Sequence, residues 1–306
     1  MQRYLVRRTL GALVVVFGVS LITFLLTFAS GDPAALMLPA DASVEEVETL
    51  RQAMGLNDPL LVQYLRFISG AIRGDFGYSM HHQEPALKLV AERLPATIQL
   101  SLAGMGIALC VGLPLGILAA TRHHSLVDLI AILAALFGQS MPSFWLGIML
   151  ILIFAVRLHA LPSFGRGGWQ HLVLPAVALA TRLMASVTRV TRSSMLEVLG
   201  EDYIWTARAK GLRERVVLLR HALRNALIPV VTIIALQFGG LMGGTVIIET
   251  VFTWPGVGFL AVRAIYTRDY PLVQASVFVL ALSFVFVNLF ADLVYGVIDP
   301  RIRVAS

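Results

Sequence analysis

Six long apolar stretches constrain the fold of this 306-residue chain more than any other feature. A helix needs about 20 mostly apolar residues to cross the hydrocarbon core of a bilayer, because each residue advances it by only about 1.5 Å. The chain reaches this length at 9–29, 97–120, 126–156, 172–190, 227–248 and 272–298. The sequence therefore predicts an all-α, polytopic membrane protein with six transmembrane helices, the third of them kinked at Pro142.

Composition agrees with this class and excludes several others. Charged residues make up 14% of the chain, against about 25% in an average soluble protein. The net charge of +6 is typical of a membrane protein oriented by its Lys and Arg residues, so it does not indicate nucleic-acid binding. Cys110 is the only cysteine, which excludes an intrachain disulfide.

Motifs for nucleotide hydrolysis or catalytic metal binding are missing from the sequence. It contains no G-x-x-x-x-G-K-[ST], no H-E-x-x-H and no C-x-x-C pattern. The adjacent His123 and His124 could suggest a metal site, but they are interpreted as solvated side chains on a short turn. A non-enzymatic chain with no metal or cofactor of its own is therefore expected.

The distribution of charge predicts the orientation. The N-terminus is basic, segment 31–94 carries nine acidic and five basic residues, and segment 189–224 carries eight basic and four acidic ones. Basic loops stay in the cytoplasm, which places both termini and segment 189–224 there. The first apolar stretch resembles a signal peptide, but it is longer than the usual h-region of about 7–15 residues. A retained N-terminal transmembrane helix at 1–30 is therefore expected.

The outer segment 31–94 is predicted to be helical. Ser43 and Glu46 have the spacing of a capping box, and Gly55 marks the end of that helix. A second helix is expected between Pro59 and about Gly70. Together they would form a small helical cap outside the membrane, which either docks a partner or only packs on the spans.

Polar residues within the apolar stretches are costly in a bilayer and usually face a partner helix or a solute pathway. Either role is open for the five candidates, which are Gln139, Ser140, Gln237, Asn288 and Asp292. Asn288 and Asp292 are expected to share a helix face, because they are four residues apart.

The polar passage at 201–230 stands out in so apolar a chain. It predicts a helix over 203–210 that ends at Gly211, and then an amphipathic helix with an apolar stripe between arginines. Pro229 is placed at the start of the fifth span. By residue pattern alone, the passage could be a helix lying on the membrane surface.

The motifs in this passage resemble a known family. "DYIWTARAKG" followed by "LRHALRNALIPV" is similar to the cytoplasmic coupling loop of permease subunits of ATP-binding-cassette (ABC) importers, and most similar to the dipeptide, oligopeptide and nickel branch. "SMPSFW", "GGWQHLVLPA", "ETVFTWPGVG" and "DPRIR" follow the same family in the same order. The resemblance implies a type I importer permease core at 95–306, with a coupling loop at 191–225.

The resemblance also implies partners and contact residues. The partners are a second homologous permease, two cytoplasmic ATPase subunits that bind ATP and Mg²⁺, and an extracytoplasmic solute-binding protein. The residues that match the ATPase-coupling loop are Asp202, Tyr203, Thr206, Ala207, Arg208, Lys210 and Gly211. Trp205 departs from the family pattern, which has a glutamate there. Four outer residues are expected either to form a gate or binding-protein contact or to pack locally, namely Phe252, Trp254, Pro255 and Gly256.

The sequence thus predicts a multi-pass protein of the bacterial inner membrane that imports di- or oligopeptides by alternating access, driven by separate ATPases. Glutathione and nickel chelates are alternative solutes within the same family. An ion-coupled secondary transporter is less favoured, because the inverted repeats or paired broken helices of that class are not evident.

Overall fold

The computed structural model describes residues 2–29, 34–35, 38, 42–53 and 55–298. Within these residues the chain is helical and contains no β-strand. Five helices are long and apolar enough to cross a membrane. These are α1 (Gln2–Ala29), α5 (Ala86–Thr121), α8 (Trp169–Leu199), the continuous helix Glu214–Val251 that contains α11 (Leu223–Val251), and α13 (Tyr270–Ile298).

The third apolar stretch is more sharply bent than a kinked helix. It forms α6 (Leu126–Ser140) and then α7 (Ser143–Leu150), which continues into a π-helical turn at Ile151–Arg157, with an angle of 106° between the two parts. Met141, with ψ of 130°, is extended because a residue before proline avoids the helical region. Pro142 therefore breaks the helix completely, and the pair counts as a sixth span only if it is taken as one bent unit.

The fifth span also differs from the prediction. The short helix α10 (Glu214–Val216), a π-helical turn at Val217–Ala222 and α11 run on without a break, so Pro229 lies inside a helix. Proline removes one hydrogen bond to the carbonyl four residues earlier. That carbonyl belongs to Asn225, which is exposed at the end of the span where water can satisfy it.

The helices pack around α8, which is the most buried of the five spans. Small residues let α5 approach it closely, and a Cβ atom at Gly104, Gly112 or Gly116 would lie within 3.1 Å of an α8 atom. The core of the bundle gathers Leu100 of α5, Leu183 and Val187 of α8, and Ile248 of α11.

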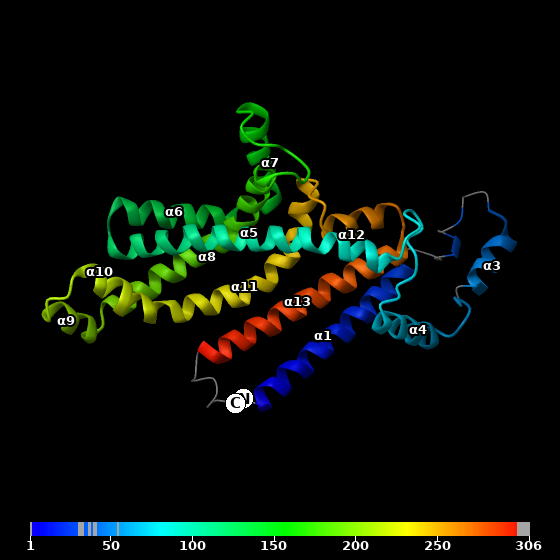
Figure 1. Cartoon of the computed structure of the whole chain (residues 1–306), viewed down its shortest axis with the longest axis horizontal. Coiled ribbons are helices and arrows are strands. Elements are labelled where there is room, and N and C mark those ends of the chain that lie inside the picture. Colours follow the sequence, from blue (N-terminus) through cyan, green and yellow to red (C-terminus); the bar gives the residue numbers. More distant parts are fainter. Residues whose placement is uncertain (1, 30–33, 36–37, 39–41, 54, 299–306) are drawn as a thin grey trace.

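The two ends of the bundle differ (Figure 1). One end carries α9 (Asp202–Ala209) and α10, and α1 begins and α13 ends on that side. The opposite end carries α3 (Val44–Ala53), α4 (Leu60–Arg73) and the short apolar helix α12 (Val257–Tyr266). Together with the positive charge around α9, this arrangement places α9 in the cytoplasm and α3, α4 and α12 outside.

The outer helices begin and end much as predicted. The Glu46 N–H donates to Ser43 Oγ at 3.2 Å and the Ser43 N–H donates to Glu46 Oε2 at 2.8 Å, which completes the capping box of α3. Gly55 adopts φ of +66° just after α3. Helix α4 begins after Pro59 but ends at Gly74, one turn later than expected, because Gly74 and not Gly70 adopts the left-handed conformation.

Candidate functional site

Helix α9 is attached to the cytoplasmic end of the spans by one of its faces. Ile204 and Ala207 are buried, three residues apart, in a cluster with Met195 of α8 and Val217 of the continuous helix. Ala207 was expected to contact an ATPase, but its side chain points toward the protein's own spans. Ile204 was missed as an anchor, although its spacing from Ala207 is the usual sign of a docked helical face.

Polar contacts fix the orientation of α9 as well. Arg208 donates to both carboxylate oxygens of Glu214, at 2.7 and 3.2 Å, across the turn that follows α9. The Tyr203 hydroxyl accepts from Asn225 Nδ2 at 2.7 Å. Neither Glu214 nor Asn225 was identified from the sequence. In this structure the polar contacts of Arg208 and Tyr203 are therefore with other residues of the same chain.

The turn at Gly211 follows the prediction. Gly211 adopts φ of +75°, and its N–H donates to the Arg208 carbonyl at 2.9 Å. A Cβ atom added there would meet no atom within 4 Å, so any cost of a side chain comes from backbone conformation alone.

The face of α9 opposite the anchors is exposed. It presents Asp202, Trp205, Thr206 and Ala209, and the exposed Lys210 follows directly after the helix. Trp205, the residue that departs from the family pattern, is 62% exposed, and the Arg208 guanidinium carbon lies 5.6 Å from the centre of its ring. An aromatic side chain held in this way offers a partner a large apolar contact at little cost in conformational entropy.

A second cytoplasmic feature joins α6 to α8. Asp128, in the first turn of α6, is buried and accepts from Arg192 of α8 in a bidentate ion pair, with Nε–Oδ1 at 2.5 Å and Nη2–Oδ2 at 2.8 Å. Ser125 caps the same turn by accepting from the Asp128 N–H at 3.4 Å. No sequence pattern identified this pair, because its members are 64 residues apart.

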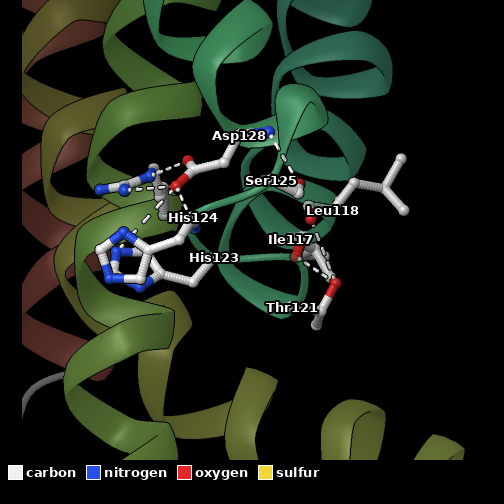
Figure 2. Close-up of polar contacts among 8 residues, drawn as sticks. Ile117, Leu118, Thr121, His123, His124, Ser125 and Asp128 are labelled. Carbon is white, nitrogen blue, oxygen red and sulfur yellow. Dashed lines mark hydrogen bonds and ion pairs between the residues drawn. The ribbon is translucent and has the colours of Figure 1, made fainter.

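Figure 2 shows Asp128 beside the two adjacent histidines of the turn before α6. The His124 N–H donates to Asp128 Oδ2 at 3.2 Å, and His123 Nε2 lies 4.0 Å from the same oxygen. Both histidine side chains are exposed. Among the residues that the structure describes, no group of three or more His, Cys, Asp and Glu side chains is placed to hold a metal ion. Because the His124 N–H donates to the carboxylate that Arg192 also holds, the turn contributes to the contact between α6 and α8.

The outer end contains a buried carboxylate that the sequence analysis also missed. Glu249 of α11 is fully buried and accepts from Thr97 Oγ1 of α5 at 2.7 Å and from the Phe259 N–H in the first turn of α12 at 2.9 Å. Gly256 and Gly258 let the backbone approach it, since a Cβ atom at either would lie within 3 Å of the carboxylate. Glu249 thus connects α5, α11 and α12.

The predicted outer residues lie in the same packed region. Phe252 and Trp254 are buried, and Trp254 Nε1 donates to the Ala96 carbonyl of α5 at 2.9 Å. Gly256 is buried and Pro255 is half-buried. In this structure they pack locally, which is one of the two alternatives that the sequence left open, and a role in a gate or a binding-protein contact stays a prediction.

The polar residues of the spans are spread over several helices. Gln139 and Ser140 are exposed at the end of α6, where Ser140 Oγ donates to the Leu136 carbonyl. Gln237 of α11 is half-buried, and Asn288 of α13 lies against Gly239 of α11. Asp292 lies in α13, but its side chain is outside the described residues. A role for these residues in a solute pathway stays a prediction.

Replacing Glu249 by alanine is expected to destabilise the outer end. The Thr97 hydroxyl and the Phe259 N–H would lose their buried acceptor, at a cost of about 1–3 kcal/mol for each group. The measurement is thermal unfolding of the purified protein in detergent. Glu249→Gln keeps one carbonyl acceptor and should lose less. Equal melting temperatures for wild type and Glu249→Ala would contradict this role.

Comparison with known proteins identifies the family. A family model described as "binding-protein-dependent transport system inner membrane component" matches residues 112–304, and the N-terminal model of the same system matches residues 1–101. The chain belongs to this family. It is an inner-membrane permease subunit of an ABC importer, and hence a multi-pass protein of the bacterial inner membrane. Permeases of this family work together with ATPase and binding-protein partners.

Individual relatives agree with the family. The chain is 42% identical over 304 residues to the glutathione transport system permease protein GsiC of Escherichia coli (strain K12) and equally to that of Shigella dysenteriae serotype 1 (strain Sd197), with 99% of each chain covered. The permease fold is similar to that of the MetNI methionine ABC transporter in two crystal forms of its inward-facing conformation. Each match has a TM-score of 0.56 and 20% identity, and covers 69% of this chain and 96% of the other.

Proposed function

We propose that this permease subunit imports short peptides, with glutathione as the first candidate. The identity of 42% over nearly the whole chain to glutathione permeases carries this proposal. Glutathione is a tripeptide, so the solute agrees with the peptide class that the sequence motifs suggest. The chain itself is proposed to be non-catalytic, with ATP and Mg²⁺ bound by two separate ATPase subunits and with no cofactor of its own.

The other subunits follow the same proposal. A second homologous permease completes the pathway across the membrane, and an extracytoplasmic binding protein delivers the solute. Much of the selectivity belongs to that binding protein. The identity of the solute is tested by measuring the melting temperature of the binding protein with glutathione, with a dipeptide and with a nickel chelate. A rise with glutathione or the dipeptide supports the proposal, and a rise with the nickel chelate alone would refute it.

The outward face of α9 is the proposed contact with an ATPase subunit. Its opposite face is fixed to the spans through Ile204 and Ala207, so a force applied to α9 reaches α8 and α11 directly. Asp202 and Thr206 belong to the exposed face and match the family loop, and Trp205 adds a large apolar contact.

Blocking this face should weaken attachment of the ATPase. In Ala209→Trp a bulky ring would replace a small exposed side chain on α9, and co-purification of the ATPase should weaken by about tenfold, which corresponds to about 1.4 kcal/mol. Arg122→Trp, at an exposed cytoplasmic position outside α9, is the matched control and should bind normally. The proposal fails if both variants retain the ATPase to the same extent while inserting normally.

A further inference from the structure

One face of helix α4 is packed against the protein, and an apolar stripe on another face is not. Gln63 and Tyr64 are buried on the packed side. On another side, Leu61, Leu65 and Ile72 are 69%, 58% and 81% exposed. They follow each other at intervals of four and seven residues, so they form one continuous stripe along the helix.

The packed face holds α4 against the membrane-spanning part of α1. The Tyr64 hydroxyl lies 2.8 Å from Ser20 Oγ, and the Tyr64 ring centre lies 6.0 Å from that of Phe17 and 5.5 Å from that of Phe24. Phe17, Ser20 and Phe24 belong to the apolar part of α1, Arg8–Leu25. Ser20 is five residues from its outer end, and five helical residues correspond to about 8 Å. Tyr64 therefore lies below the outer end of this apolar part, at a depth that corresponds to the acyl chains of the outer leaflet.

Helix α1 also exposes apolar side chains beside its contact with α4. Phe17, Ile22 and Leu25, all within five residues of Ser20 along α1, are about half exposed. Figure 1 shows α4 alongside the outer end of α1, whereas α3 extends away from the spans.

Charged residues border the stripe on α4. Arg66 and Arg73 lie about a quarter of a turn or more from it on the helix, and both are exposed. Arg66 also pairs with Asp58 at 2.6 Å. Basic side chains on the polar side of a helix whose apolar side enters the bilayer can reach the phosphate groups of the lipids.

We propose that α4 is an interfacial helix whose stripe of Leu61, Leu65 and Ile72 inserts among the acyl chains of the outer-leaflet phospholipids. A soluble binding protein and the second permease are the other conceivable occupants. Helix α4 packs against the apolar part of α1, a depth that a soluble protein does not enter, and a covering permease would shield the stripe from both oxygen and a water-soluble nickel chelate. The inserted stripe holds the outer segment on the membrane surface and fixes its position relative to α1. This proposal does not depend on the identity of the transported solute.

Depth measurements on spin labels test the proposal in the assembled transporter, reconstituted in bilayers of phosphatidylethanolamine and phosphatidylglycerol. Cys110 is exposed and is first replaced by alanine. A nitroxide label is then placed at Leu61→Cys, Leu65→Cys or Ile72→Cys. Val14→Cys on α1 serves as the reference within the membrane, and Ala53→Cys on the polar helix α3 as the reference in water, since both positions are exposed.

The expected result is that the three stripe labels collide with dissolved oxygen and are shielded from a water-soluble nickel chelate, as at Val14. Their depth parameter should shift to the membrane side of the value at Ala53, and it should not change when the binding protein is added. Collision with the nickel chelate at the stripe would show that it faces water and would overturn the proposal. Shielding from both reagents, with or without the binding protein, would show that protein covers the stripe and would overturn it equally.

Discussion

Arg192→Met is expected to lower the stability of this permease by about 3 kcal/mol, because removing one partner of a buried ion pair leaves the other charge without compensation. Asp128 is 4% exposed, and Arg192 supplies both of its side-chain donors. The remaining partners of Asp128 are the His124 N–H and the more distant His123 ring. Thermal unfolding of the purified protein in detergent measures the loss.

Two further variants make this prediction specific. Arg189→Met removes an exposed charge one turn earlier on α8 and should leave the melting temperature nearly unchanged. Combining Asp128→Asn with Arg192→Met removes the uncompensated charge and should restore part of the stability. If Arg192→Met and Arg189→Met unfold at the same temperature, the ion pair does not stabilise the protein.

Gly116→Val is expected to separate α5 from α8 where the two helices pack tightly. A Cβ atom at Gly116 would lie 2.6 Å from Thr191 Cβ and 2.7 Å from the Thr188 carbonyl oxygen, both in α8. Because one of these is a backbone atom, a rotamer change cannot relieve the overlap. Overpacking of this kind costs about 1–3 kcal/mol or more, so the melting temperature and the yield of folded protein should both fall.

Gly106→Val is the matched control for that variant. Gly106 lies in the same helix, but an added Cβ atom would meet nothing within 4 Å. The same substitution there changes helix propensity without forcing a contact. If the two valine variants are equally stable, close packing of α5 on α8 does not support the bundle.

The positions of most spans and of α9 could be predicted from local pattern. Apolar length marks a span whatever its neighbours are, and Gly211 stops α9 because of its own backbone freedom. The break at Pro142 was underestimated as a kink. A proline alone does not say whether a helix bends or ends, and here the extended Met141 ends it.

The candidate site was predicted in part. The exposed positions Asp202, Thr206 and Lys210 belong to the predicted coupling loop. Ala207 was also assigned to it, yet its side chain is buried in the protein's own core. A loop motif identifies a helix but not which of its faces is outward, since that depends on the elements packed beside it.

Local features of the chain were sufficient to show that it crosses the membrane several times, which way it is oriented and which family it belongs to. Apolar length, charge and motifs are each carried by residues that are close together in the sequence. The folded structure was needed to show that Asp128 pairs with Arg192, that Glu249 connects three helices and that α4 packs on α1. The pairs Asp128–Arg192, Thr97–Glu249 and Ser20–Tyr64 lie 64, 152 and 44 positions apart in the chain. Such pairs are formed by the packing of the helices, and no local pattern records them.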